Sequence, residues 1–147
     1  MTKLQAIRDF TASILGEYVT IARDRCEDNN WAMDISNSTP RLKIPKILEM
    51  VHDESDKAFR KNFVERCPLA QGFSHVTLTL LHECGHWATR SVMNIIEYDK
   101  EVALAYTQEL YMQNPWEMLA TQWAICWLLD PANRKIAKKF EKEYFAK

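Results

Sequence analysis

The spacing of hydrophobic and polar residues along the chain predicts mainly helices. In residues 3–25 the apolar side chains recur at helical spacing on one face, and charged side chains occupy the other positions. Residues 26–40 are rich in Asn, Asp, Ser and Thr, which predicts a loop. The pattern in residues 41–51 is mixed and includes Pro45, so this segment is predicted to be an edge strand or a short helix.

The rest of the chain is predicted as helices separated by short breaks. These helices cover residues 54–66, 75–90, 100–113, 115–129 and 132–146. Ser74 is a favourable N-cap, Pro115 and Pro131 suit the start of a helix, and Gly72 lies in a turn over residues 68–73. Since the chain has only three glycines and no repeat, we expect one mainly α domain, with room for an α+β class containing at most a small sheet.

Composition and charge narrow the class of protein. The 147 residues are 47% hydrophobic and 27% charged, which is typical of a folded domain and excludes a disordered tail. The net charge of -1 disfavours a nucleic-acid partner, and no apolar run reaches the roughly 18–20 residues that cross a membrane. Charges interrupt the N-terminus and the cysteines form no CxxC pair, so we expect a cytoplasmic protein with reduced thiols.

The stretch with specific chemistry is the HExxH sequence from His82 to His86. On a helix, residues four apart project from the same face, so both imidazoles can contact one zinc ion. Glu83 follows His82 directly and is placed to contact a zinc-bound water rather than the metal. The pattern therefore predicts His82 and His86 as metal ligands and Glu83 as the catalytic general base.

The surroundings of this motif support the prediction. The motif lies in an apolar helix, where two histidines without partners are costly to bury. Gly85 is unfavourable inside a helix by about 1 kcal/mol relative to Ala, so another backbone or a ligand is expected to approach closely there. The alternative is a pair of core histidines with ordinary hydrogen bonds and a surface Glu83.

A catalytic zinc site needs a third protein ligand, and Glu117 is the best candidate. No third histidine follows at the metzincin spacing, and Glu117 is a lone carboxylate on a strongly apolar helix. Ala120, Thr121 and Ala124 follow on the same side, where small side chains allow close helix packing. The alternative is a capping box between Asn114 and Glu117. The other carboxylates considered are Glu97, Asp99, Glu101 and Glu109.

Several other polar and aromatic residues have weaker candidate roles. A donor to the developing oxyanion can come from Tyr98, Tyr106, Tyr111 or His75. Cys126 is predicted to be a buried structural thiol, and the tryptophans 116, 123 and 127 are predicted to be core residues. The basic C-terminal helix is expected to be a solvated face.

The sequence Leu-Leu-His-Glu-Cys-Gly-His-Trp-Ala-Thr at residues 80–89 resembles the active-site helix of small cytoplasmic zincins. It is similar to the metallopeptidase domain of antirestriction proteins, and the Glu117 segment also resembles that of mobile-element peptidases that cleave repressors. The resemblance covers about residues 74–130. It implies a minimal zincin-like fold of the gluzincin type, with the HExxH helix packed on a helix that carries Glu117 as third ligand.

These features lead to a functional hypothesis. We expect one domain over residues 1–147, with a support region (1–70), a metal-site core (74–130) and a basic C-terminal helix (131–147). The leading hypothesis is a zinc-dependent metallopeptidase that acts on a protein or peptide substrate, by analogy a regulatory or defence protein of a phage or mobile element. The alternative is a non-catalytic zinc-binding inhibitor or interaction protein of phage type.

Overall fold

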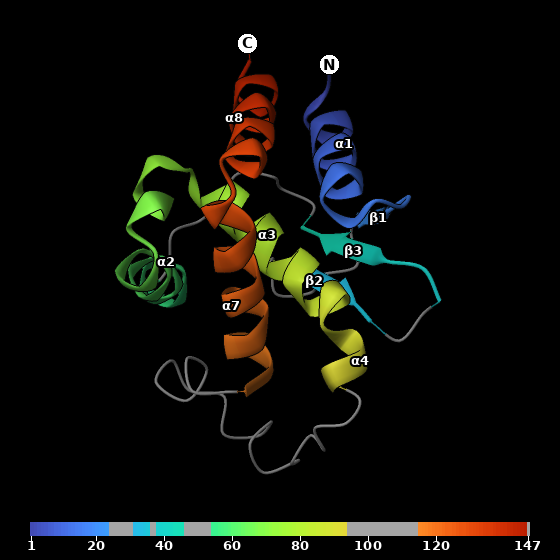
Figure 1. The fold of residues 1–147 in the computed structure, drawn as a ribbon. Coiled ribbons are helices and arrows are strands. Elements are labelled where there is room, and N and C mark those ends of the chain that lie inside the picture. The colour runs from blue at the N-terminus through green and yellow to red at the C-terminus, as the bar shows by residue number, and fades with distance from the viewer. Residues whose placement is uncertain (24–30, 36–37, 46–53, 94–114, 147) are drawn as a thin grey trace.

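A computed structural model describes residues 1–23, 31–35, 38–45, 54–93 and 115–146, which form helices and one small sheet (Figure 1). The helices are α1 (Lys3–Leu15), α2 (Glu54–Arg66), α3 (His75–Ala88), α4 (Arg90–Met93), α7 (Pro115–Leu129) and α8 (Pro131–Tyr144), with a short 3-10 helix η1 (Pro68–Gly72). The expectation of a mainly helical chain with at most a small sheet is confirmed. The helix predicted over residues 100–113 lies outside the described residues.

The first helix is shorter than predicted. It begins after Thr2, whose side chain accepts a hydrogen bond from the Gln5 backbone N–H, and it ends at Leu15. Gly16 then takes the left-handed conformation (φ 71°), which stops the helix because a residue with a side chain is strained there. Residues 20–23, predicted as the end of this helix, instead form a strand, in line with the β-branched residues of this segment.

The sheet has three strands in the order β1-β3-β2. β1 (Thr20–Arg23) pairs in parallel with β3 (Arg41–Ile44), and β2 (Ala32–Asp34) pairs antiparallel with β3. Residues 32–34 were predicted as part of a loop, and that prediction is wrong. A three-residue strand is too short to produce a recognisable alternation of polar and apolar residues.

β3 is the central strand rather than an edge strand. Leu42 and Ile44 are fully buried in the core, which requires cover on the face that carries them. Pro45 follows the last residue of the strand, so its missing N–H removes no hydrogen bond from β3. The prediction of an edge strand here was therefore wrong in position, because it gave weight to a proline that lies just beyond the strand.

The main core joins the two ends of the described chain. The ring of Phe10 on α1 stacks on that of Phe140 on α8 with centroids 4.3 Å apart, and Trp127 on α7 contacts Phe10 edge-on at 6.0 Å. Figure 1 shows α1 and α8 side by side, with both termini at the same end of the molecule. All three tryptophans of α7 were predicted to be core residues, and two of them, Trp123 and Trp127, are partly buried and pack against this core.

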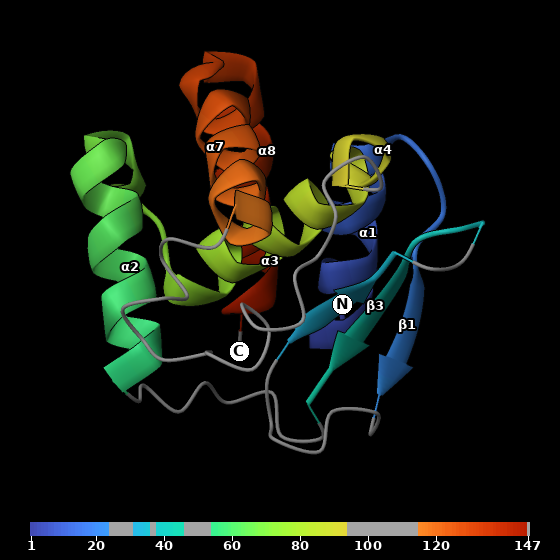
Figure 2. The same cartoon turned by 90° about the horizontal axis from the view of Figure 1, so that it is seen from below.

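Helix α3 lies at the centre of the fold and crosses α7. Figure 2 shows α2 on one side of these helices and the sheet on the other, with β2 the strand that packs on α3. Nearly every side chain of α3 is buried, which explains its apolar sequence. The helices predicted over 54–66 and 115–129 are confirmed, and α3 begins after the predicted cap Ser74.

The N-terminus of α3 is held by α8. One carboxylate oxygen of Glu141 accepts hydrogen bonds from the Ser74 backbone N–H and from the Thr77 hydroxyl, the latter at 2.8 Å. Lys138, one turn earlier on α8, donates to the Gly72 carbonyl and lies over the ring of Phe73. The C-terminal helix therefore fixes the start of the helix that carries the HExxH motif.

In the part of the chain that the structure describes, every helix is too short or too polar to cross a lipid bilayer.

Candidate metal centre

The two motif histidines project from the same face of α3. They are one helical turn apart, and their ring centroids are 4.7 Å apart with the ring planes nearly perpendicular. The His82 ring is buried, and Phe59 of α2 packs edge-on against it with centroids 5.2 Å apart. The Nε2 atoms of both rings are directed at the first turn of α7.

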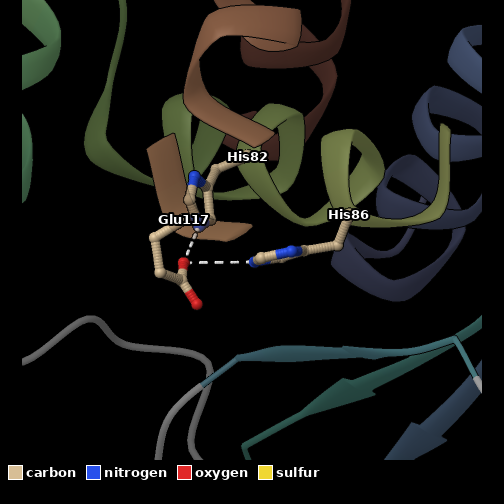
Figure 3. A group of neighbouring side chains, drawn as sticks. All are labelled: His82, His86 and Glu117. Carbon is tan, nitrogen blue, oxygen red and sulfur yellow. Dashed lines mark hydrogen bonds and ion pairs between the residues drawn. The ribbon is translucent and has the colours of Figure 1, made fainter. Parts of the chain in front are cut away.

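Glu117 on this first turn brings a carboxylate between the two rings. Its Oε2 atom is 2.6 Å from His82 Nε2 and 3.1 Å from His86 Nε2, and Figure 3 shows the two rings converging on this oxygen. The structure therefore brings together the three residues that the sequence predicted as ligands. The side chains of His86 and Glu117 each remain 13% exposed, so the group can be reached from solvent.

The donor set is of a kind that can hold a divalent metal ion. One ligand atom from each of His82, His86 and Glu117 lies within 4.8 Å of the other two, and among the described residues this group can hold a metal ion. Two imidazoles and one carboxylate are the three protein ligands of one class of catalytic zinc site. Ligands about 2.0–2.1 Å from a tetrahedral ion are about 3.3 Å apart, so Glu117 Oε2 would have to move slightly away from both Nε2 atoms to admit the ion.

The charges of the cluster shift the pKa values of its members. Burial pushes the pKa of Glu117 up, but hydrogen bonds and attraction from the two histidines outweigh burial and hold that pKa far below its usual range. For His86, burial pushes the pKa down, while the hydrogen bond to Glu117 and the charges of Glu83 and Glu117 give a net rise. The negative charges of Glu83 and Glu117 therefore favour a positive charge among His82, His86 and Glu117, whether it is a proton or a metal ion.

Glu83 lies beside the cluster but does not belong to it. Its side chain is buried on the face of α3 toward the sheet, and Oε2 accepts a hydrogen bond of 2.7 Å from the backbone N–H of Met33 in β2. Burial raises the pKa of Glu83, and the nearby His86 and His82 offset only part of this rise. The carboxylate is thus held in place and made more basic than an exposed glutamate.

Thr121 completes the surroundings of His82. Its hydroxyl lies 2.9 Å from His82 Nδ1, and it occupies α7 one turn after Glu117. In the sequence, Thr121 is recognisable only as a small residue that allows close packing, and the contacts of Phe59 and Met33 are not predicted. The spacing of four residues between Glu117 and Thr121 was the available signal for the first of these three contacts.

Gly85 occupies the place where α3 and α7 cross. A Cβ atom at this position would collide with the backbone of Ala120. The expectation that another backbone approaches Gly85 is therefore confirmed, and the close approach explains how Glu117 of α7 reaches His82 and His86 of α3.

The remaining sequence candidates fall into three groups. His75 is buried near the start of α3 with Phe59 edge-on to its ring at 5.9 Å. Cys126 is exposed on α7, so the prediction of a buried thiol was wrong: position 126 follows Met118 and Gln122 on the outer face of that helix. The residues that lie outside the described part of the chain are Glu97, Tyr98, Asp99, Glu101, Tyr106, Glu109, Tyr111 and Asn114.

Comparison with known proteins finds no match for this chain: no protein-family model, no curated protein and no solved structure matches it.

Proposed function

We propose that this chain is a zinc-dependent metallopeptidase that hydrolyses a peptide bond in a protein substrate. One observation carries the proposal: the convergence of His82 Nε2, His86 Nε2 and Glu117 Oε2 next to a buried glutamate on the same helix. Two histidines and a glutamate as ligands, with a further glutamate one residue after the first histidine, are the components of a metal-assisted hydrolase.

Each residue has a distinct role in this proposal. His82, His86 and Glu117 hold the ion, which when bound supplies Lewis acidity toward a peptide carbonyl and lowers the pKa of water. Glu83 takes a proton from the attacking water onto its carboxylate and then delivers it to the leaving amine. Its raised pKa supports both steps, because a more basic carboxylate accepts the proton readily and its conjugate acid lies closer to neutral pH.

The expected substrate is a regulatory or defence protein of a phage or mobile element. This part of the proposal depends on the resemblance of residues 74–130 to antirestriction and repressor-cleaving peptidases. We also propose that the enzyme acts in the cytoplasm, which agrees with the free thiols of Cys67, Cys84 and Cys126.

A second candidate is a zinc-binding protein that acts by binding a partner without catalysis. One contact favours it, the hydrogen bond from the Met33 N–H to Glu83. If Glu83 serves only to accept this hydrogen bond from the edge strand β2, its role is structural and not catalytic. The two candidates differ in one requirement: the peptidase needs Glu83 to accept a proton, and the binding protein does not.

The test combines metal content with hydrolysis. We expect one zinc ion per chain in the wild type, and loss of this ion in His86→Ala and Glu117→Ala. Zinc at 100 times its dissociation constant should stabilise the wild type by about 2.7 kcal/mol, and it should not stabilise the two variants. Isothermal titration and thermal unfolding with and without a chelator measure both effects.

Hydrolysis is followed with a library of quenched fluorescent peptides. The matched variant is Glu83→Gln, which keeps the size of the side chain and an oxygen that can accept from Met33 N–H. Retained zinc with hydrolysis lowered at least about 100-fold supports the peptidase, in line with the usual contribution of a general base. Equal hydrolysis by the wild type and Glu83→Gln, or no hydrolysis by either, overturns it.

A further inference from the structure

Both nitrogen atoms of the His82 ring are contacted from a single face of α7. Glu117 Oε2 lies 2.6 Å from Nε2, and Thr121 Oγ1 lies 2.9 Å from Nδ1. Glu117 and Thr121 are four residues apart, so they project from adjacent turns of the same side of the helix. One helix thus holds both edges of the ring.

The contact at Nδ1 distinguishes the two orientations of the ring. A rotation of half a turn about the last side-chain bond exchanges each ring nitrogen with a ring carbon, and a carbon does not form this hydrogen bond with a hydroxyl. Packing by Phe59 alone does not distinguish these orientations, because their shapes are nearly the same. The hydroxyl of Thr121 therefore favours the orientation in which Nε2 is directed at Glu117 and the metal position.

The same contact favours one tautomer. A histidine that binds a metal through Nε2 must carry its proton on Nδ1, and a hydrogen-bond acceptor at Nδ1 stabilises that form. The Thr121 oxygen is such an acceptor, and Thr121 as a residue is only 5% exposed, so water competes little for the proton. A neutral hydroxyl does this without adding a further carboxylate to those of Glu83 and Glu117.

We infer that Thr121 is a positioning residue for the metal centre: its hydroxyl accepts a hydrogen bond from His82 Nδ1–H and directs Nε2 of His82 at the ion. The inference rests on the metal site of the proposed function and deepens it. Thr121 acts through His82 and contacts neither the ion nor a substrate.

The experiment measures zinc affinity by competition with a chromophoric chelator. Thr121→Val removes the hydroxyl and keeps the shape, and we expect zinc to bind about 10–100-fold more weakly, the usual effect of removing the hydrogen-bond partner of a ligating histidine. Thr121→Ser keeps the hydroxyl and should bind zinc within a few-fold of the wild type. Thr11→Val is the matched control, since Thr11 is fully buried on α1 and its hydroxyl donates to the Ile7 carbonyl.

A spectroscopic readout on the wild type tests the orientation of the His82 ring without any variant. In the zinc-loaded wild type, long-range ¹⁵N–¹H spectra of the histidine rings should place the proton of His82 on Nδ1 and the metal on Nε2. Coordination of the ion through Nδ1 overturns the inference, and this outcome can be seen even if Thr121→Val fails to fold.

The remaining outcomes distinguish this inference from the peptidase proposal. Wild-type zinc affinity in Thr121→Val, or an affinity of Thr121→Ser as low as that of Thr121→Val, overturns the role of Thr121 alone. Zinc binding that depends on Thr121 without peptide hydrolysis supports this role and overturns the peptidase. No zinc binding by the wild type overturns both.

Discussion

Gly85 on α3 and Ala120 on α7 are in backbone contact, and no side chain fits between them. A Cβ atom placed on Gly85 would lie 3.0 Å from both the Cα and the carbonyl carbon of Ala120, and it would collide with the carbonyl oxygen. This crossing lies between His82 and His86 on one helix and three residues after Glu117 on the other. The arrangement of the three candidate metal ligands therefore depends on a glycine that is not one of them.

This contact predicts that Gly85→Ala destabilises the protein and weakens zinc binding. In an ordinary helix the change would stabilise by up to about 1 kcal/mol. Here the two helices must separate, and overpacking of this kind costs about 1–3 kcal/mol before that gain is subtracted. Urea unfolding in the presence of a chelator measures the free energy of unfolding, and chelator competition measures the zinc affinity.

The control for this variant is Gly72→Ala. A Cβ at Gly72 would have the Lys138 ammonium at 3.8 Å, an ordinary contact with the end of a flexible side chain. We expect the free energy of unfolding to change by less than about 0.5 kcal/mol, as for most exposed positions. If Gly85→Ala is as stable as Gly72→Ala and binds zinc normally, the close approach of α3 and α7 is not what places the ligands.

The parts of the site that the sequence predicted are those that depend on local spacing. His82 and His86 are one turn apart on any helix, and Glu117 followed from the need for a third ligand and from its position on an apolar helix. The contacts of Thr121 with His82 and of Met33 with Glu83 depend on how α3 packs on α7 and on β2. The spacing of four residues between Glu117 and Thr121 is a signal within one helix for the first contact, but no pattern within one element encodes the contact of Met33 with Glu83.

For the fold, too, the elements with clear local signals were predicted and the others were not. Caps and prolines placed α3, α7 and α8 to within about two residues, the usual error for helix ends. The strands of three and four residues were missed or misplaced because so short a segment shows no reliable alternation. The first helix was predicted too long because the apolar pattern continues past Gly16, where the left-handed backbone ends the helix.

The hydrogen bond between Met33 and Glu83 predicts different stabilities for two substitutions of Glu83. Burial raises the pKa of Glu83, so its charged form opposes folding as the pH rises above the ordinary value of 4.5. Glu83→Gln removes this charge and keeps an acceptor for Met33 N–H, so we expect it to be at least as stable as the wild type at pH 7. Glu83→Leu leaves that N–H without its acceptor and should be about 1–3 kcal/mol less stable than Glu83→Gln.

Urea unfolding at several pH values in the presence of a chelator tests this comparison. The advantage of Glu83→Gln over the wild type should be absent below pH 4.5 and should grow as the pH rises toward the raised pKa of Glu83. Equal stability of the Gln and Leu variants would show that the contact with Met33 contributes nothing.

The pairing of Glu117 with His86 predicts a pH window of stability for the protein in chelator. The pKa of Glu117 is lowered, so its contribution is present above 4.5 and is lost as the pH falls below that value. The pKa of His86 is raised, so its contribution is present below 6.5 and is lost as the pH rises through the raised value. The difference in unfolding free energy between the wild type and Glu117→Gln should be largest between these two values.

Unfolding curves of both proteins between about pH 3 and pH 9 give this difference directly. A maximum between pH 4.5 and 6.5 is the expected result. A difference that is constant over the whole range would mean that the charges of Glu117 and His86 do not interact in the folded protein.

The clamp between α8 and the start of α3 predicts that Glu141 stabilises the motif helix from a distance. Glu141 accepts from the Ser74 N–H and from the Thr77 hydroxyl, and Thr77 is fully buried, so Glu141→Ala leaves these donors without this acceptor. We expect a loss of about 1–3 kcal/mol in the free energy of unfolding. We also expect faster amide hydrogen exchange in the first turn of α3, which gives a local readout.

Glu143 on the same helix is the matched control. It forms an ion pair with Lys139 at 3.9 Å, and such surface pairs contribute about 0–1 kcal/mol. Glu143→Ala should therefore leave exchange in α3 unchanged. Because Glu141 lies outside the candidate metal site, Glu141→Ala should still bind one zinc ion. Its zinc affinity should fall only as far as unfolding of the first turn of α3 reduces the population of chains that can bind. A loss of stability in Glu141→Ala no larger than in Glu143→Ala would show that Ser74 and its own helix suffice to hold α3.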